Sequence, residues 1–203
     1  MNYLKMNHPD SDTILISFAG HDKGFGGIPQ LQFVRFFETK FHHISRHFYL
    51  DPHSNLYHQG MSQLSNSIDE TVAYLKNEIK PYKKVICMGV SAGGYAAILF
   101  GSLLSATTVL AFIPQTIRRS NKINETYRDL QPHLNDTTHY ILYADTSIIH
   151  VQDVHHVSHC ERIADRPNVD VIKIPHFNLK TIRDNGELFN ILQNIIEESV
   201  PIP

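Results

Sequence analysis

The chain has 203 residues, which is enough for one domain with a sizeable hydrophobic core and few for two. Its 42% hydrophobic and 19% charged residues are an ordinary globular balance, and the formal net charge of -2 gives no electrostatic reason to expect binding to nucleic acid or to an anionic membrane. No apolar run approaches the roughly 20 residues of a membrane span, and the first residues lack the apolar region of a signal peptide.

Two cysteines are present, Cys87 in a predicted buried strand and Cys160 in a predicted helix. Isolated cysteines of this kind are typical of free thiols in a reducing compartment. The sequence therefore predicts a cytoplasmic protein without disulfides.

The first predicted strand is the buried apolar run over 13–18, and the loop that follows it over 19–27 contains four glycines. A glycine-rich loop at the end of a strand brings backbone N–H groups close to a ligand. We expect the N–H of His21, or next to it that of Gly20, to bind a developing negative charge. A flexible connection without a chemical role is the alternative.

The next elements alternate between helix and strand. Pro29 suits the first turn of a helix that buries Phe33 and Phe37, and a strand is predicted over 46–50. Apolar residues then recur on one helix face from 64 to 79, where Ser67 and Glu70 resemble a capping box. Because that helix leads into another strand, the sequence predicts a β-α-β crossover and hence a parallel sheet.

The stretch from Lys84 to Phe100 reads as a short apolar strand, a sharp turn and a helix of small residues. Its turn, Gly89-Val90-Ser91-Ala92-Gly93, has the G-x-S-x-G pattern of a nucleophile elbow, which exposes the serine hydroxyl above a sheet. The N–H of Ala92 would lie beside the serine, where a tetrahedral oxyanion develops. The alternative is a glycine-rich turn that only packs or that binds a phosphate.

The second half of the chain continues the alternation. A strand over 107–113 is followed by a polar segment over 115–136, which we interpret as a surface excursion or a small lid. Further elements are a strand over 139–143, a helix over 156–164, a strand over 169–174 and a C-terminal helix from about 184–187. The pattern predicts one three-layer α/β domain over 1–203, with a mostly parallel sheet and helices on both faces.

A serine hydroxyl needs a base within hydrogen-bond reach and a carboxylate that orients this base. His176 comes directly after the last predicted strand, at an edge of the sheet where catalytic groups gather, and is the predicted base. Two carboxylates follow the strand that ends near Tyr143. We favour Asp153, on the longer loop, over Asp145, whose side chain could instead hold a turn.

The elbow, the order Ser91, Asp, His176 and the alternation of strands and helices resemble the α/β-hydrolase superfamily. A closer likeness, through 93–97 and 183–188, is to small bacterial hydrolases often associated with surface-polysaccharide gene clusters. The resemblance implies hydrolysis of an ester, thioester or amide through an acyl-serine, without a cofactor. The expected substrate is a small molecule or an acylated glycan.

His155 and His159 are one helical turn apart, a spacing that can bind zinc, but no cysteine or carboxylate at a diagnostic spacing completes a site. We therefore expect no metal. Two other functions remain open: an acyltransferase that uses the same Ser91, Asp153 and His176, and a hydrolase-like binding protein without catalysis. The second would be favoured if His176 and both aspartates lay beyond reach of Ser91.

Overall fold

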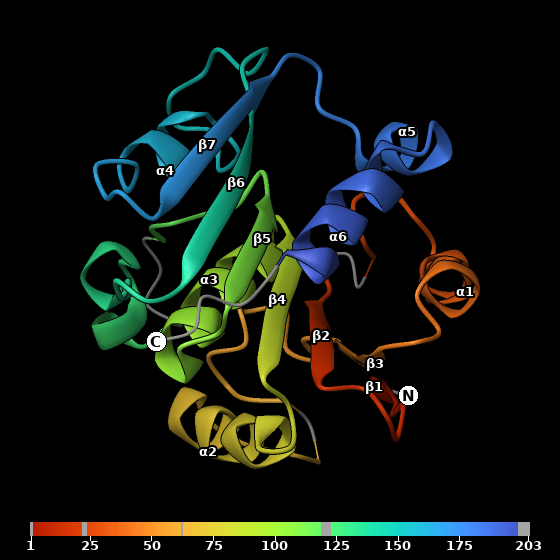
Figure 1. Cartoon of the computed structure of the whole chain (residues 1–203). Coiled ribbons are helices and arrows are strands. Elements are labelled where there is room, and N and C mark those ends of the chain that lie inside the picture. Colours follow the sequence, from red (N-terminus) through yellow and green to blue (C-terminus); the bar gives the residue numbers. More distant parts are fainter. Residues whose placement is uncertain (1, 22–23, 62, 119–122, 199–203) are drawn as a thin grey trace.

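The computed structural model describes residues 2–21, 24–61, 63–118 and 123–198. One sheet of seven strands runs through this part of the chain, in the order β1-β3-β2-β4-β5-β6-β7 (Figure 1). Only β1 is antiparallel to its neighbour, and the other pairs are parallel. The strands are β1 (Tyr3–Met6), β2 (Thr13–Phe18), β3 (Ser45–Tyr49), β4 (Lys84–Val90), β5 (Thr108–Phe112), β6 (His139–Asp145) and β7 (Val169–Ile174).

Helices cover both faces of the sheet, as predicted (Figure 1). The core on one face contains residues of α2, α3 and α4, and the core on the other contains residues of α1, α5 and α6. These two cores make the fold a three-layer α/β sandwich. The helices are α1 (Gln30–Lys40), α2 (Ile68–Ile79), α3 (Ala92–Leu104), α4 (Ser158–Glu161), α5 (Leu179–Asp184) and α6 (Glu187–Glu197), with short 3-10 helices η1 (Glu125–Tyr127) and η2 (Gln131–His133).

Local sequence signals explain several helix boundaries. The hydroxyl of Ser67 accepts the backbone N–H of Glu70 at 3.1 Å, which caps α2. Pro29 is the N-cap of α1 rather than a residue of its first turn. α3 is buried on nearly all sides, which accounts for its run of glycine and alanine between the sheet and α2.

The structure differs from the prediction at four elements. The edge strand β1 has no counterpart in the prediction, and β6 continues two positions beyond Tyr143 to Asp145. The helix predicted over 156–164 is only the short α4, because residues on both sides of it form turns. Residues before α6 form the separate helix α5.

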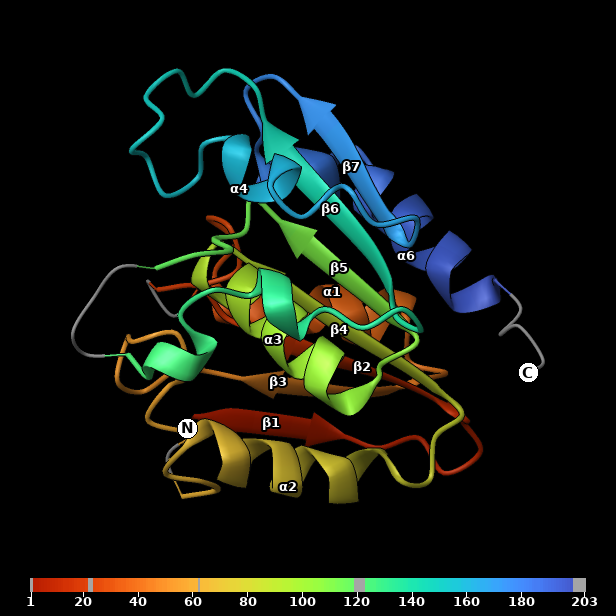
Figure 2. The same cartoon turned by 90° about the vertical axis from the view of Figure 1, so that its left-hand side faces the viewer.

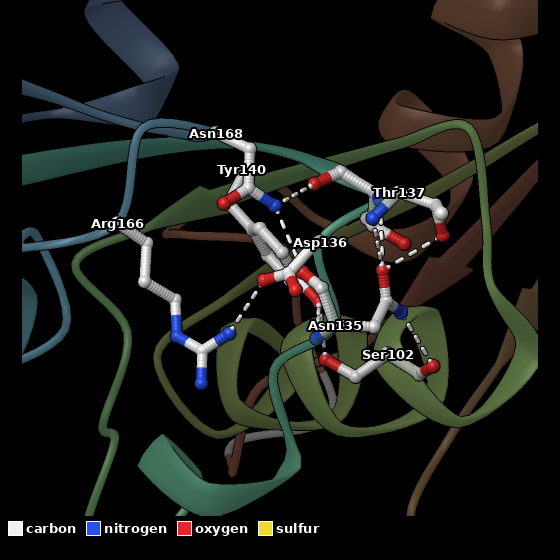
Figure 3. Close-up of polar contacts among 8 residues, drawn as sticks. Ser102, Asn135, Asp136, Thr137, Tyr140, Arg166 and Asn168 are labelled. Atoms are coloured by element: carbon white, nitrogen blue, oxygen red, sulfur yellow. Dashed lines mark hydrogen bonds and ion pairs between the residues drawn. The ribbon is translucent and has the colours of Figure 1, made fainter.

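A polar network fastens the amino-terminal ends of the last two strands (Figure 3). The amide of Asn135 donates to the carbonyl of Ser102 at 2.8 Å, and its oxygen accepts the N–H of Thr138 at 2.8 Å. The amide of Asn168, just before β7, donates to the carbonyls of Asn135 and Thr138. These bonds join α3, β6 and β7 at the end of the sheet opposite Ser91.

Both cysteines are buried free thiols, and burial raises the pKa of each to about 12, so neither is a reactive thiolate at neutral pH. Within the described ranges, no helix has the length and hydrophobicity needed to span a membrane.

Candidate active site

Ser91 lies between β4 and α3, in the sharp turn that the sequence predicts. Its backbone has φ 55 and ψ -115, a conformation that non-glycine residues rarely adopt. Hydrogen bonds on both sides hold this conformation: Ser91 N–H donates to the carbonyl of Phe112 at 2.9 Å, and the carbonyl of Ser91 accepts the N–H of Tyr95 at 3.0 Å. The turn therefore presents the hydroxyl in a fixed direction beyond the carboxyl end of β4.

The glycines of the motif are required by close packing. A β-carbon on Gly89 would lie 2.0 Å from the carbonyl oxygen of Gly93, and one on Gly93 would lie 2.1 Å from the carbonyl oxygen of Phe18. Real β-carbons do not approach backbone atoms so closely, so any larger residue would push α3 away from β2 and β4.

The side chain hydrogen-bonded to the Ser91 hydroxyl is that of His155. Its Nε2 lies 2.6 Å from the Ser91 Oγ, across 64 positions of sequence. His155 belongs to the loop between β6 and α4, which extends beyond the carboxyl ends of the strands (Figure 2). Burial lowers the pKa of His155, and the nearby charge of Asp153 offsets part of this effect. The lowered pKa favours the neutral form of the imidazole, which can accept a proton.

Asp153 orients His155 mainly through the backbone. Its Oδ1 accepts the N–H of His155 at 2.8 Å, an Asx turn, and the same oxygen lies 3.7 Å from the ring Nδ1. The second distance is too long for a hydrogen bond but short enough for an electrostatic interaction with an imidazolium.

His176, the predicted base, follows β7 as expected, but its ring is not bonded to Ser91. Residue 176 has φ 54 and an exposed side chain, and within the described residues its ring forms no hydrogen bond. Its backbone N–H donates to Asp145 Oδ1 at 3.1 Å. The turn after β7 is thus built around the carboxylate of Asp145. The structure therefore brings together Ser91 and Asp153 of the predicted triad, with His155 in place of His176.

Asp145, the other candidate acid, lies at the end of β6. Its carboxylate accepts the N–H and the hydroxyl of Ser147 at 2.8 and 2.7 Å, and the N–H groups of His176 and Phe177 at 3.1 and 3.0 Å. Burial by itself would raise the pKa of Asp145, but these hydrogen bonds outweigh it and lower the pKa. Asp145 therefore remains charged and joins the loops after β6 and β7.

Ser91 opens into a cavity of about 490 Å³, whose walls come from five separate stretches of the chain. Both predicted oxyanion donors, His21 and Ala92, line it. The Gly20 N–H, the other candidate, already donates to the carbonyl of Gly24 at 2.8 Å. The lining residues are His21, Ser54, Asn55, Leu56, Ser91, Ala92, Gln115, Arg118, Ile123, Val154 and His155.

Among the described residues, the N–H groups of His21 and Ala92 donate to no protein acceptor. Ala92 is the first residue of α3, where a backbone N–H has no partner within the helix. For His21, the described part of the chain contains no acceptor of its N–H. Two such groups beside a serine can stabilise an oxyanion.

The segment 115–136, predicted to be an excursion or a lid, supplies one wall of the cavity through Gln115, Arg118 and Ile123. It is fastened to the core by His58. The N–H of Asn124 donates to His58 Nδ1 at 2.9 Å, so His58 Nε2 carries the proton and donates to the Tyr95 hydroxyl at 2.9 Å. That hydroxyl in turn donates to the carbonyl of Tyr127.

The histidines that suggested a zinc site have other partners. His155 is bonded to Ser91, and His159 Nδ1 accepts the N–H of Thr116 at 3.2 Å. In the ranges that the structure describes, no group of three or more His, Cys, Asp or Glu side chains could hold a metal ion.

No protein-family model matches the chain, and a search of curated proteins finds no match. Solved structures do match. A lipase-esterase related protein from Clostridium acetobutylicum has a TM-score of 0.61 at 12% identity, with 95% of this chain and 98% of that chain covered. An α/β serine hydrolase without a lid, from Xanthomonas campestris, has a TM-score of 0.57 at 12% identity, with 99% and 90% covered.

A third match is a capsule O-acetyltransferase mutant of Neisseria meningitidis serogroup A in complex with CoA. Its TM-score is 0.63 at 13% identity, with 94% of this chain and 90% of that chain covered. At these identities the likeness concerns the fold alone. The order and direction of the strands, the helices on both faces and these matches together show that the chain has the α/β-hydrolase fold.

Proposed function

We propose that the protein is a serine hydrolase, an esterase or deacylase that acts through an acyl-enzyme on Ser91. The observation that carries the proposal is the 2.6 Å contact between the Ser91 Oγ and the Nε2 of His155 at a strained elbow. A serine in this position, hydrogen-bonded to a neutral imidazole and facing a cavity, has what a nucleophile requires.

The residues divide the reaction between them. His155 Nε2 takes the hydroxyl proton while the Ser91 Oγ attacks the carbonyl carbon, and the N–H groups of His21 and Ala92 bind the resulting oxyanion. Collapse of the intermediate releases the leaving group, which takes the proton from His155. A water molecule then attacks the carbonyl carbon of the acyl-serine while His155 takes its proton. Collapse of this second intermediate releases the acid, and His155 returns the proton to the Ser91 Oγ. Asp153 stabilises the imidazolium that forms in both halves of the reaction.

The size of the cavity supports a small acyl group or a small-molecule ester, because about 490 Å³ lies in the lower half of the range of ligand pockets. An acylated glycan fits the same cavity if only its acyl group and the attached sugar enter. The proposal therefore covers small-molecule esters and acylated glycans of this kind.

The first test uses a fluorophosphonate probe, which labels an activated serine, followed by intact-protein mass spectrometry and a panel of p-nitrophenyl esters of increasing chain length. Ser91→Ala should abolish both labelling and turnover, with a loss on the order of 10⁶ in kcat when the catalytic residues act as a unit. The fold should persist, because the Ser91 side chain makes no capping hydrogen bond to α3. Undiminished hydrolysis by pure, folded Ser91→Ala protein would refute the proposal.

An acyltransferase is the second candidate, and the CoA-bound O-acetyltransferase among the structural matches is the observation that favours it. In that reaction an alcohol replaces water in the second half. Adding glycerol or glucose to the ester assay separates the two: a transferase forms acylated alcohol in preference to free acid, whereas a hydrolase keeps releasing the acid.

A further inference from the structure

We propose that the active-site cavity selects substrates carrying a negatively charged group, which Arg118 binds. This inference rests on the proposed function and concerns the substrate class of the same site. It starts from the charges of the cavity wall: Arg118 is a cationic residue, and none of the described lining residues is an aspartate or a glutamate.

The guanidinium of Arg118 has no counter-ion in the part of the chain that the structure describes, and its one side-chain hydrogen bond there is a long one, 3.4 Å to Gln115 Oε1. Other arginines nearby are paired. Arg128 bonds to Glu125 at 2.8 Å, and Arg162 bonds to Asp129 at 2.7 Å. Arg118 therefore keeps most of its donors available to a ligand.

The backbone of Arg118 is fixed, which holds the start of its side chain at a defined place in the cavity wall. Its N–H donates to the carbonyl of Arg128 at 3.0 Å, and the neighbouring Ile117 and Asp129 form an antiparallel bridge. Gln115, whose side-chain oxygen accepts the long hydrogen bond from the guanidinium, is 6% exposed. Arg118 thus belongs to the wall of the cavity into which Ser91 opens.

The other lining residues that the structure describes add no negative charge. Burial lowers the pKa of His155, which favours its neutral form, and the positive end of the α3 dipole points to the same space. A carboxylate or phosphate on the substrate would meet a planar guanidinium that can bind it through two donors. The charged group belongs either to the acyl chain or to the leaving alcohol, and the two sources give different experimental results.

The experiment compares two matched ester pairs by kcat/KM. The first pair places the charge on the leaving group: 4-acetoxybenzoate against its neutral amide, 4-acetoxybenzamide. The second places it on the acyl chain: p-nitrophenyl hemiglutarate against p-nitrophenyl pentanoate. Wild-type protein should favour the anionic member of one pair by about 10- to 100-fold, the range expected for a charge-assisted hydrogen bond.

Arg118→Gln should remove that preference by raising KM for the anionic ester much more than for its neutral partner. Arg166→Gln is the matched control, since it removes the same charge from the far end of the sheet, where Arg166 pairs with Asp136 (Figure 3). Equal rates for both members of both pairs, or equal losses on charged and neutral esters in Arg118→Gln, would overturn the proposal.

A binding measurement separates this proposal from the proposed function. Folded Ser91→Ala protein should bind 4-acetoxybenzoate or p-nitrophenyl hemiglutarate more tightly than the neutral partner in a calorimetric titration, and Ser91→Ala with Arg118→Gln should not. Selective binding, together with no turnover or fluorophosphonate labelling of the wild-type protein, would support anion binding by Arg118 and refute the proposed hydrolase activity. Labelling and turnover without any anion preference would refute anion binding by Arg118 and support the hydrolase activity.

Discussion

His155 and His176 are the two candidates for the proposed base, and backbone hydrogen bonds place their rings differently. The Asx turn with Asp153 directs His155 toward Ser91, whereas the turn around Asp145 leaves the ring of His176 exposed. The sequence signal for His155 is the short spacing Asp153-Val154-His155, which favours such a turn. That signal is weaker than the position of His176 at the end of a strand, which led the prediction to His176.

Exchange of each histidine for glutamine tests this choice. His155→Gln should lower kcat by on the order of 10⁴ or more, because His155 is the base bonded to the Ser91 Oγ among the described residues. His176→Gln should keep near-wild-type kcat, since its ring has no described partner and only its backbone is bonded. Both are measured on one p-nitrophenyl ester with circular dichroism as the folding control. A collapse in His176→Gln with normal rates in His155→Gln would return the role to His176.

Substitution of Asp153 should affect mainly activity, whereas substitution of Asp145 should affect mainly stability. Asp153→Asn should reduce kcat about 10- to 1,000-fold, which is less than for a triad aspartate with a short bond to the ring, because the Asp153–His155 ring distance is 3.7 Å. Asp145→Asn should instead lower the free energy of unfolding by about 2 kcal/mol, since it weakens charge-assisted bonds to Ser147, His176 and Phe177. Urea unfolding and turnover of both variants check this, and a catalytic loss without destabilisation in Asp145→Asn would reverse the roles.

Among the elements, α4 and the segment 115–136 form one unit at the rim of the site. The Thr116 hydroxyl donates to the carbonyl of His159 at 2.6 Å, and Arg162 on the C-terminal side of α4 pairs with Asp129 at 2.7 Å. α4 follows the loop that carries His155, so these contacts also fix the end of that loop.

Thr116→Val should therefore leave a partly buried carbonyl without its donor, lower the free energy of unfolding by about 1–3 kcal/mol, and reduce kcat. Thr138→Val is the matched control: Thr138 is equally buried, but its hydroxyl has no partner among the described residues, so valine should be neutral or stabilising. Thermal unfolding and turnover measure both effects. Equal stability changes in the two variants would argue against the role of Thr116.

The elements that could be predicted are those with a strong apolar pattern. β2, β4 and β5 are continuous buried runs, and α6 buries one periodic face, so each was found within a few residues. β1 is only four half-buried residues, and α4 is a single turn. Neither carries enough apolar periodicity to define it. The elbow could be predicted because close packing against backbone atoms requires glycines at fixed positions around Ser91. The position of the loop with His155 could not be predicted, because hydrogen bonds rather than hydrophobic spacing determine its course.

At the scale of the whole molecule, buried histidines make folding sensitive to mild acid. Burial lowers the pKa of His47 to about 4, and burial likewise lowers that of His58 to about 4, in both cases against the raising effect of a carboxylate. Between pH 6.5 and 4 the unfolded chain binds protons that the folded chain does not. Stability is therefore fully present above about pH 6.5 and falls as the pH drops, by about 1.4 kcal/mol per pH unit for each histidine.

Urea unfolding followed by circular dichroism at pH 7, 6 and 5 should show this decline. His58→Gln, which cannot take up a proton, should have a shallower pH dependence, while His42→Gln at an exposed position should keep the wild-type slope. The lowered pKa of Asp145 acts in the same direction, but only at lower pH, near and below the ordinary pKa of a carboxyl group. A stability that does not change from pH 7 to 5 would contradict the buried neutral state of His47 and His58.

The bridge between Asp145 and His156 closes the base of the loop that carries Asp153 and His155. Because its two ends lie together, the loop can be exchanged or deleted without opening the sheet. In the proposed mechanism the nucleophile lies between β4 and α3 in the centre of the fold, whereas the residues that transfer the proton lie on this one loop. Under that mechanism, deleting the loop at the bridge would remove the base and its carboxylate together and leave Ser91 without a proton acceptor, and grafting the loop would transfer both groups to another scaffold.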